Sequence, residues 1–198
     1  MSPPLLMQCM SIRSSTINNI SSSQRATEQW LSGCPAEASV ALVGMGANLP
    51  SGKQSPADTL QQALEAMRPL SLQMPLVSPF FTTEPEDCPP GSPVFVNAVA
   101  MLCCSAATSP ISLLESLLDI EDRQGRARSG LRNEPRVLDL DLLAFADQEC
   151  DSDFLTLPHP RAHQRRFVLE PLSALWPEYQ FPGQSQSVKT LLTSLLAA

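Results

Sequence analysis

Arginine and aspartate side chains gather in one short stretch of the chain, between residues 121 and 143. Two carboxylates, Asp139 and Asp141, stand two residues apart, and arginines at positions 126, 128, 132 and 136 run directly into them. Carboxylate oxygens suit Mg²⁺, which completes its coordination with water and with phosphate oxygens of a substrate. Arginine binds phosphate through a planar fork of donors that lysine lacks. The combination predicts metal-assisted phosphoryl chemistry.

The segment that carries the two carboxylates alternates leucine with aspartate over residues 138–142. Side chains on a β-strand point alternately to its two faces, so a strand here would bury three leucines and project both carboxylates from the other face. Such charges also occur on ordinary solvated surfaces, where an ion pair usually contributes less than about 1 kcal/mol. The joint pattern of cations and paired carboxylates favours a functional site over that simpler interpretation.

The composition limits the classes of function. A chain of 198 residues with a net charge of -7 and a sequence pI near 4.8 is long enough for one catalytic domain, and its overall field repels polyanions. We therefore expect no nucleic-acid partner and no membrane partner. No apolar run reaches the roughly 20 residues that span a bilayer. We expect a soluble, cytoplasmic protein that is a monomer.

Six cysteines, at positions 9, 34, 88, 103, 104 and 150, show no spacing typical of zinc sites or of a disulfide framework. We interpret them as free thiols in a reducing compartment. Cys103 and Cys104 end an apolar run, and we expect them to be small core residues.

The first 38 residues are rich in serine and show no sustained apolar periodicity. Such a segment buries too little surface to offset the entropy lost on ordering, so we expect residues 1–38 to be a disordered N-terminal extension before a catalytic domain at 39–198. A transit peptide is one alternative for this segment. Another is a start codon placed too far upstream, because Met7 and Met10 are available downstream.

The rest of the chain predicts alternating strands and helices. Ser55 followed by Pro56, with Asp58 three residues after the serine, is typical of a helix start, and Ser109-Pro110 begins a second helix. The expected elements are a buried strand from Val40, a helix at 55–67, an edge strand within 71–82, strands at 94–104 and 137–146, a short extended piece at 155–160, and further elements at 166–175 and 188–196. This order predicts an α+β fold, a ferredoxin-like α/β/α sandwich with a mainly antiparallel sheet.

Four blocks of the sequence, taken in order, resemble the 6-hydroxymethyl-7,8-dihydropterin pyrophosphokinase (HPPK) family between about Val40 and Pro182. They are GANL (46–49), FFTTEP (80–85) with VFVNAV (94–99), GRAR followed by PRVLDLDLL (125–143), and LPHPRAHQRRFVLEPL (157–172). The resemblance implies transfer of a diphosphate from ATP to the pterin alcohol in folate biosynthesis, with AMP and the pterin diphosphate as products. It implies two Mg²⁺ ions as cofactors and ATP as co-substrate.

The resemblance also assigns roles to individual residues. It places both Mg²⁺ ions on Asp139 and Asp141, and catalysis on Arg126 and Arg136. The implied ATP contacts are Arg128, Thr156, His159 and Arg165, and the implied pterin contacts are Thr83, Phe95, Asn97 and Phe167. Without it, the two phenylalanines would be interpreted as core residues, and Asn97 as a partner of a strand-end backbone group. We interpret Arg161 and Arg166 as solvated surface residues.

The chain departs from the family pattern beside the nucleotide. The usual Arg-Trp-Gly-Pro-Arg segment reads Arg-Asn-Glu-Pro-Arg at 132–136, Ser129 replaces a frequent basic residue, and Phe154 stands where a second arginine is frequent. Loss of the tryptophan and gain of Glu134 are expected to weaken closure of a loop over ATP. Two hypotheses follow: an active pyrophosphokinase, which the retained Asp pair favours, and a weakly active or inactive pterin-binding paralogue. An Asp-x-Asp glycosyltransferase is excluded by size and by the missing nucleotide-sugar domain pattern.

Overall fold

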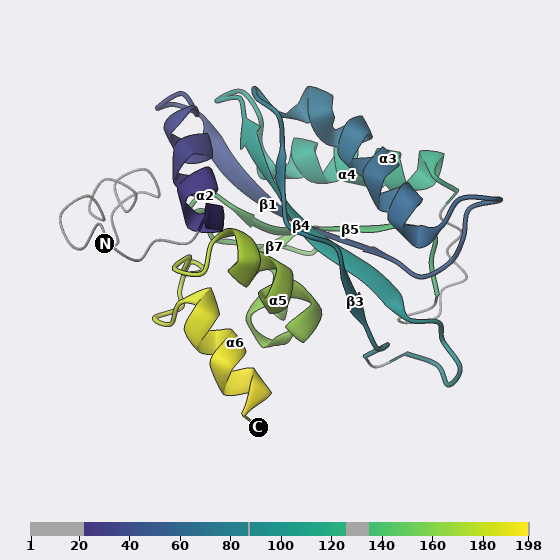
Figure 1. The fold of residues 1–198 in the computed structure, drawn as a ribbon. Coiled ribbons are helices and arrows are strands. Elements are labelled where there is room, and N and C mark those ends of the chain that lie inside the picture. The colour runs from purple at the N-terminus through teal and green to yellow at the C-terminus, as the bar shows by residue number, and fades with distance from the viewer. Residues whose placement is uncertain (1–21, 87, 126–134, 198) are drawn as a thin grey trace.

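A central antiparallel sheet organises the fold in the computed structural model, which describes residues 22–86, 88–125 and 135–197. Its long strands are β1 (Ser39–Ala47), β4 (Phe95–Cys104) and β5 (Asp139–Phe145), and two short strands lie at one edge, β2 (Leu76–Val77) and β3 (Phe81–Thr83). The strand order is β2-β4-β1-β5, with β3 also paired to β4. Helices cover both faces of this sheet (Figure 1). The predicted α+β, ferredoxin-like α/β/α sandwich is confirmed.

The edge strand expected within residues 71–82 is interrupted. Ser78 and Pro79 separate β2 from β3, and proline cannot donate a hydrogen bond to a sheet. Ser78 bridges the break, since its backbone N–H donates to the Val99 carbonyl and its hydroxyl accepts from the Val99 N–H, both at 3.0 Å. Both halves of the edge therefore remain attached to β4.

One face of the sheet packs against α3 (Pro56–Met67) and α4 (Pro110–Arg123), which lie together above it in Figure 1. Both helices begin with a capping box after a serine, formed by Ser55 with Asp58 and by Ser109 with Ser112, as the sequence predicts for the two starts. The hydrogen bonds from Ser55 to the Asp58 carboxylate hold the pKa of that group below its usual value. The side chains that α3 and α4 bury against the sheet include Leu60, Ala63, Met67, Leu113 and Leu117.

The opposite face packs against α2 (Ser22–Ser32), α5 (Arg166–Leu175) and α6 (Val188–Leu196). The segment between α5 and α6 contributes two buried aromatic residues, Tyr179 and Phe181, whose ring centroids lie 5.1 Å apart. A short hairpin of β6 (Cys150–Asp151) and β7 (Thr156–Leu157) follows β5 and leads into α5. This face of the sheet also carries the side chains of the pocket described below.

Helix α2 corrects the prediction that the whole of 1–38 is disordered. Residues 22–38 are ordered, and α2 lies against α5 (Figure 1). Its anchors come from distant parts of the chain: the Thr27 hydroxyl donates to the Leu175 carbonyl at 2.7 Å, and the Trp30 indole N–H donates to the Met74 carbonyl at 2.7 Å. Sequence periodicity detects only local patterns, so tertiary anchors of this kind escape it.

Thr27→Val tests the anchoring of α2. The change keeps the shape of the side chain and removes a buried hydroxyl, so we expect the free energy of unfolding to fall by about 1 kcal/mol. Urea unfolding followed by circular dichroism measures this. Thr193→Val is the control, because the Thr193 hydroxyl makes a 2.8 Å bond to the Lys189 carbonyl on an exposed face of α6. Equal effects of the two changes would contradict the anchoring role.

The five cysteines that the structure describes are free thiols, as expected. Cys103 and Cys104 are fully buried in the core, which confirms their interpretation as core residues. Burial raises the pKa of Cys104 to about 12, and burial together with Cys103 also raises the pKa of Cys34. These two thiols are therefore protonated at neutral pH and poor nucleophiles.

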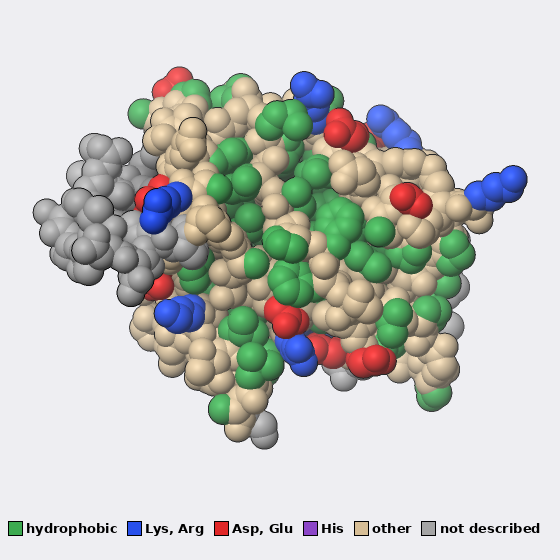
Figure 2. Space-filling model, in the orientation of Figure 1, with side chains coloured by type: hydrophobic (Ala, Val, Ile, Leu, Met, Phe, Trp, Pro, Cys, Tyr) green, Lys and Arg blue, Asp and Glu red, His purple; other side chains and the backbone are tan. Residues whose placement is uncertain are grey.

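Charged side chains are scattered over the surface shown in Figure 2. Lys and Arg side chains lie among Asp and Glu side chains, mostly toward the edges of this view, rather than in one basic patch. Among the described residues, no helix has the length and apolar character needed to cross a bilayer.

Candidate active site

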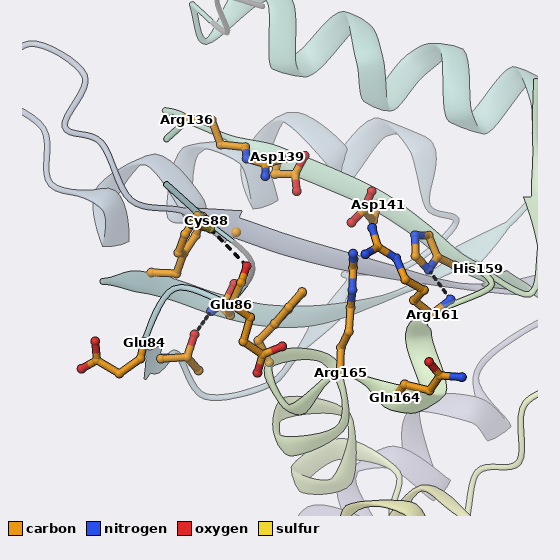
Figure 3. Close-up of a pocket in the computed structure, with 15 residues that line it drawn as sticks. Glu84, Glu86, Cys88, Arg136, Asp139, Asp141, His159, Arg161, Gln164 and Arg165 are labelled. Carbon is orange, nitrogen blue, oxygen red and sulfur yellow. Dashed lines mark hydrogen bonds and ion pairs between the residues drawn. The ribbon is translucent and has the colours of Figure 1, made fainter. Parts of the chain in front are cut away.

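A pocket of about 340 Å³ opens on the sheet face that also packs against α5 (Figure 3). Its floor comes from sheet strands, one wall from the segment after β3, and another from the turn before α5. The lining residues are Gly46, Thr83, Phe95, Asn97, Asp139 and Asp141 on strands, Arg136 just before β5, Glu84, Glu86 and Cys88 after β3, and His159, Arg161, Gln164, Arg165 and Phe167 near α5.

The carboxylates of Asp139 and Asp141 both face the pocket from β5. Leu138, Leu140 and Leu142 point to the opposite face, where they are at most 3% exposed. The predicted alternation on this strand is confirmed. Arg136, three residues ahead, forms an ion pair with Asp139 through Nη1 and Oδ1 at 3.0 Å.

A buried glutamate supports this strand from behind. Glu121, near the end of α4, is only 1% exposed, and its Oε1 accepts a 2.6 Å hydrogen bond from the backbone N–H of Leu140. Strand β5 is at the edge of the sheet and pairs only with β1 along the described residues, so Leu140 could not obtain this bond from another strand. Glu121 therefore fixes the residue between the two aspartates.

Two ionised carboxylates this close together are unfavourable unless a cation lies beside them. Burial and the like charge of Asp139 together raise the pKa of Asp141 to about 7, against the lowering effect of Arg165 and Arg136. Among the described residues, no group of three or more His, Cys, Asp and Glu side chains could hold a metal. A pair of oxygen donors fits Mg²⁺, because this ion retains waters and takes its other ligands from substrate phosphates.

Cations face the carboxylates across the pocket. Arg161 and Arg165 come from the turn before α5, and both side chains extend toward Asp141 (Figure 3). Burial, with help from these two arginines, lowers the pKa of His159 to about 4, so the imidazole is neutral at pH 7. Its Nδ1 accepts a 3.2 Å hydrogen bond from the Arg161 backbone N–H, which orders the turn.

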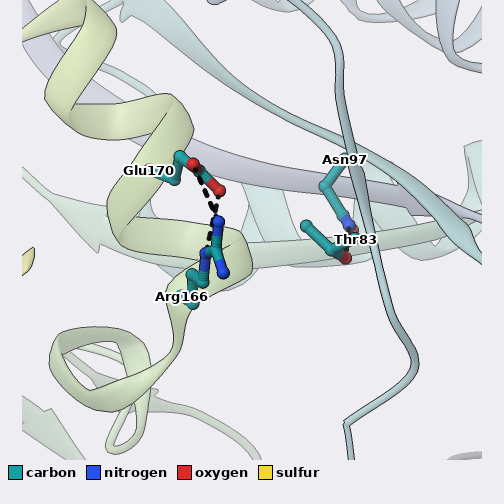
Figure 4. Close-up of polar contacts among 4 residues, drawn as sticks. All are labelled: Thr83, Asn97, Arg166 and Glu170. Carbon is teal, nitrogen blue, oxygen red and sulfur yellow. Dashed lines mark hydrogen bonds and ion pairs between the residues drawn. The ribbon is translucent and has the colours of Figure 1, made fainter. Parts of the chain in front are cut away.

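The other half of the pocket is aromatic with one amide. Phe95 and Asn97 share a face of β4, and Phe167 approaches from the start of α5. Asn97 is 5% exposed and its Nδ2 donates to the Thr83 hydroxyl at 2.7 Å, so its orientation is fixed (Figure 4). The Arg165 guanidinium carbon lies 5.2 Å from the centre of the Phe167 ring, and this cation–π contact joins the two halves.

Most of the predicted site residues meet in this pocket. The structure brings together Thr83, Phe95, Asn97, Arg136, Asp139, Asp141, His159, Arg165 and Phe167. Thr156 does not line the pocket: it lies on β7 with its hydroxyl 3.4 Å from the Asp151 carboxylate. Arg126, Arg128, Ser129, Asn133 and Glu134 lie outside the described residues. Phe154 is 56% exposed and does not line the pocket.

Sequence reasoning missed several lining residues. Arg161 needs a correction: it is a pocket residue and not merely a solvated one. Its spacing, two residues after His159 and four before Arg165, could have signalled this. Arg166, in contrast, forms a surface pair with Glu170, with an Nε–Oε2 distance of 3.2 Å (Figure 4). The other missed residues are Gly46, Glu84, Glu86, Cys88 and Gln164.

Comparison with known proteins agrees with this geometry. Residues 42–177 match the 7,8-dihydro-6-hydroxymethylpterin-pyrophosphokinase (HPPK) family. A 2-amino-4-hydroxy-6-hydroxymethyldihydropteridine pyrophosphokinase of Pseudomonas aeruginosa is 40% identical, over 71% of this chain and 82% of that protein. The Haemophilus influenzae protein of the same name is 35% identical, over 77% and 90%.

Solved structures show the same fold. A crystal structure of Plasmodium falciparum HPPK-DHPS aligns with a TM-score of 0.62 and 13% identity, over 81% of this chain. The chain spans 45% of the length of that longer protein.

Fold and pocket together define a small α+β domain whose pocket has one half lined by carboxylates and arginines and one aromatic half. The chain belongs to the HPPK family.

Proposed function

We propose that this protein transfers a diphosphate from ATP to 6-hydroxymethyl-7,8-dihydropterin, as a step of folate biosynthesis. The products are AMP and the pterin diphosphate. Membership of the family and relatives named for this activity support the proposal. The single observation that carries it is the pocket, in which an aromatic half with an amide adjoins a half with two carboxylates and several cations.

The cationic half binds the triphosphate. Arg165 and Arg161 extend into the pocket from one wall, and Arg136 stands beside Asp139 at the other side. Because phosphoryl transfer needs positioning and charge stabilisation more than covalent help from the protein, these guanidinium groups are suited to hold the phosphates and to stabilise charge on the departing AMP. Arg126, Arg128 and Thr156 are proposed as further nucleotide contacts from the family resemblance.

Two Mg²⁺ ions are proposed on Asp139 and Asp141, where they would neutralise triphosphate charge and orient the reacting groups. The clustering of both carboxylates on one face of β5 supports this assignment. Without a cation, burial and mutual repulsion disfavour two ionised carboxylates at this spacing. Arg136 offsets part of that repulsion through its contact with Asp139.

The aromatic half binds the pterin. A flat polar ring is held by stacking on aromatic faces and by hydrogen bonds at its edge. Phe95 and Phe167 supply the faces, while Asn97 supplies an amide that is already held by Thr83. The hydroxymethyl group then points toward the cationic half.

The reaction is one displacement at phosphorus. The hydroxymethyl oxygen attacks the β-phosphorus of ATP, the bond from that phosphorus to the oxygen shared with the α-phosphate breaks, and AMP leaves. The hydroxyl proton passes to solvent. No protein nucleophile takes part, so the side chains serve to align the attacking oxygen with the leaving one.

AMP release tests the proposal. Purified protein with ATP, Mg²⁺ and 6-hydroxymethyl-7,8-dihydropterin should form AMP and the pterin diphosphate in equal amounts, and omission of the pterin or of Mg²⁺ should abolish both. Protein that binds the pterin but forms no AMP would overturn the enzymatic assignment in favour of a pterin-binding paralogue.

The enzyme is further proposed to act as a monomer in the cytoplasm. The match covers 82% of the Pseudomonas aeruginosa relative and 90% of the Haemophilus influenzae relative, so these proteins are of similar length to this chain.

A further inference from the structure

Three strands bring one row of residues across the floor of the pocket. In the register of the sheet, Gly46 on β1 is paired with Asn97 on β4 and with Asp139 on β5. All three line the pocket. The row therefore runs from the Asn97 amide in the aromatic half, over Gly46, to the Asp139 carboxylate in the cationic half.

A side chain at position 46 would crowd the Asn97 amide. A Cβ atom at this position would lie 3.0 Å from Oδ1 of Asn97, 3.9 Å from Cδ1 of Phe95 and 4.0 Å from Cβ of Asp139. A separation of 3.0 Å between carbon and oxygen is shorter than ordinary van der Waals contact, so the Asn97 amide would have to move. The other two contacts are ordinary ones.

Movement of the amide has a direct consequence for its hydrogen bond. The Asn97 Nδ2 atom donates to the Thr83 hydroxyl at 2.7 Å, while Oδ1 of the same amide is the atom nearest to Gly46. Displacement of Oδ1 therefore also disturbs the bond on the other side of the amide. A buried amide group left without its hydrogen-bond partner is destabilised, because it has also lost its contacts with water.

Gly44, two residues earlier on the same strand face, provides a comparison. The three atoms nearest to a Cβ there all belong to the Leu143 side chain, and the closest is the terminal Cδ2 at 3.3 Å. Such an atom can yield by a small rotation. Gly44 does not line the pocket, although it is paired with Asp141 across the sheet.

We infer that Gly46 is a positioning residue for pterin binding: the absence of a side chain there holds the Asn97 amide in the orientation that reads the ring edge. The inference rests on the proposed function of the pocket. Neighbouring strands are about 4.8 Å apart, so β4 and β5 are separated by roughly twice that distance. Gly46 thus lies beneath the point where a pterin alcohol over β4 meets a phosphate over β5.

The test compares Gly46→Ala with Gly44→Ala in the full chain. Binding of 6-hydroxymethylpterin, in the presence of Mg²⁺ and a non-hydrolysable ATP analogue, is measured by calorimetry for each variant. We expect Gly46→Ala to weaken pterin affinity about tenfold, the loss expected when one buried amide contact is disturbed. Gly44→Ala should bind the pterin as wild type does, and both variants should keep wild-type affinity for the ATP analogue.

A second comparison keeps the test decisive even if Gly46→Ala lowers stability. In an Asn97→Ala background, the added Gly46→Ala change should cause no further loss of pterin affinity, because the amide through which it acts is gone. An undiminished loss in that background would overturn the inference, as would equal pterin binding by Gly46→Ala and wild type. Wild-type protein that binds no pterin would overturn the proposed function instead.

Discussion

Asp141→Asn should reduce AMP formation by on the order of a thousandfold, because a metal-held charge clamp contributes several kcal/mol to the transition state. The side chain keeps its size but can no longer offer a charged oxygen to a divalent cation. Its position beside Asp139 on the pocket face of β5 makes it the residue whose charge the proposed chemistry needs most.

The same variant should fold normally. Asp141 is held away from bulk water and beside the like charge of Asp139, so removal of its charge relieves repulsion instead of breaking a stabilising pair. Thermal unfolding of metal-free protein measures this. Asp119→Asn is the matched control, since Asp119 forms an exposed pair with Arg123 on α4 at 3.1 Å. Turnover by Asp141→Asn equal to that of the control would overturn the metal assignment.

Glu121→Ala should lower the free energy of unfolding by about 2 to 3 kcal/mol, the cost of a buried donor left without its acceptor together with lost packing. The donor is the Leu140 N–H, which lies between the two aspartates. We also expect AMP formation to fall, because the strand that presents Asp139 and Asp141 loses its support from α4.

Glu121→Gln distinguishes the hydrogen bond from the charge. Glutamine retains a carbonyl oxygen at the same place, so it should restore most of the stability and the activity that alanine loses. Urea unfolding and AMP release measure the two effects side by side. If glutamine were as damaging as alanine, the bond to Leu140 would not be the main contribution of this side chain.

Local signals were sufficient to predict much of the architecture. The serine-proline starts of α3 and α4 lie where the capping pattern indicates, and the alternation around Asp139 and Asp141 predicts which face of β5 is buried. Each of these patterns spans only three or four residues, and the tertiary contacts favour the same local structure. The family resemblance predicted that residues far apart in the sequence, such as Phe95 and Phe167, belong to one site, and both line the pocket.

Other features depend on contacts between distant residues and escaped prediction. Helix α2 has few buried side chains of its own, and its anchors at Met74 and Leu175 are far away in the sequence. Arg161 follows the same pattern: its spacing to His159 and Arg165 is a weak signal, and the fold of the turn toward β5, which makes it a pocket residue, depends on distant contacts. Glu121 gave no local signal either, since its partner is a backbone group on another element.

The position of Gly46 on the central strand β1 also bears on how substrates enter. Strand β1 is bonded on both sides, to β4 and to β5, so its amide protons should exchange with solvent only when the whole sheet opens. The pocket walls, in contrast, come from the segment after β3 and the turn before α5. Any movement of these walls during ligand exchange would therefore leave the floor folded from one turnover to the next.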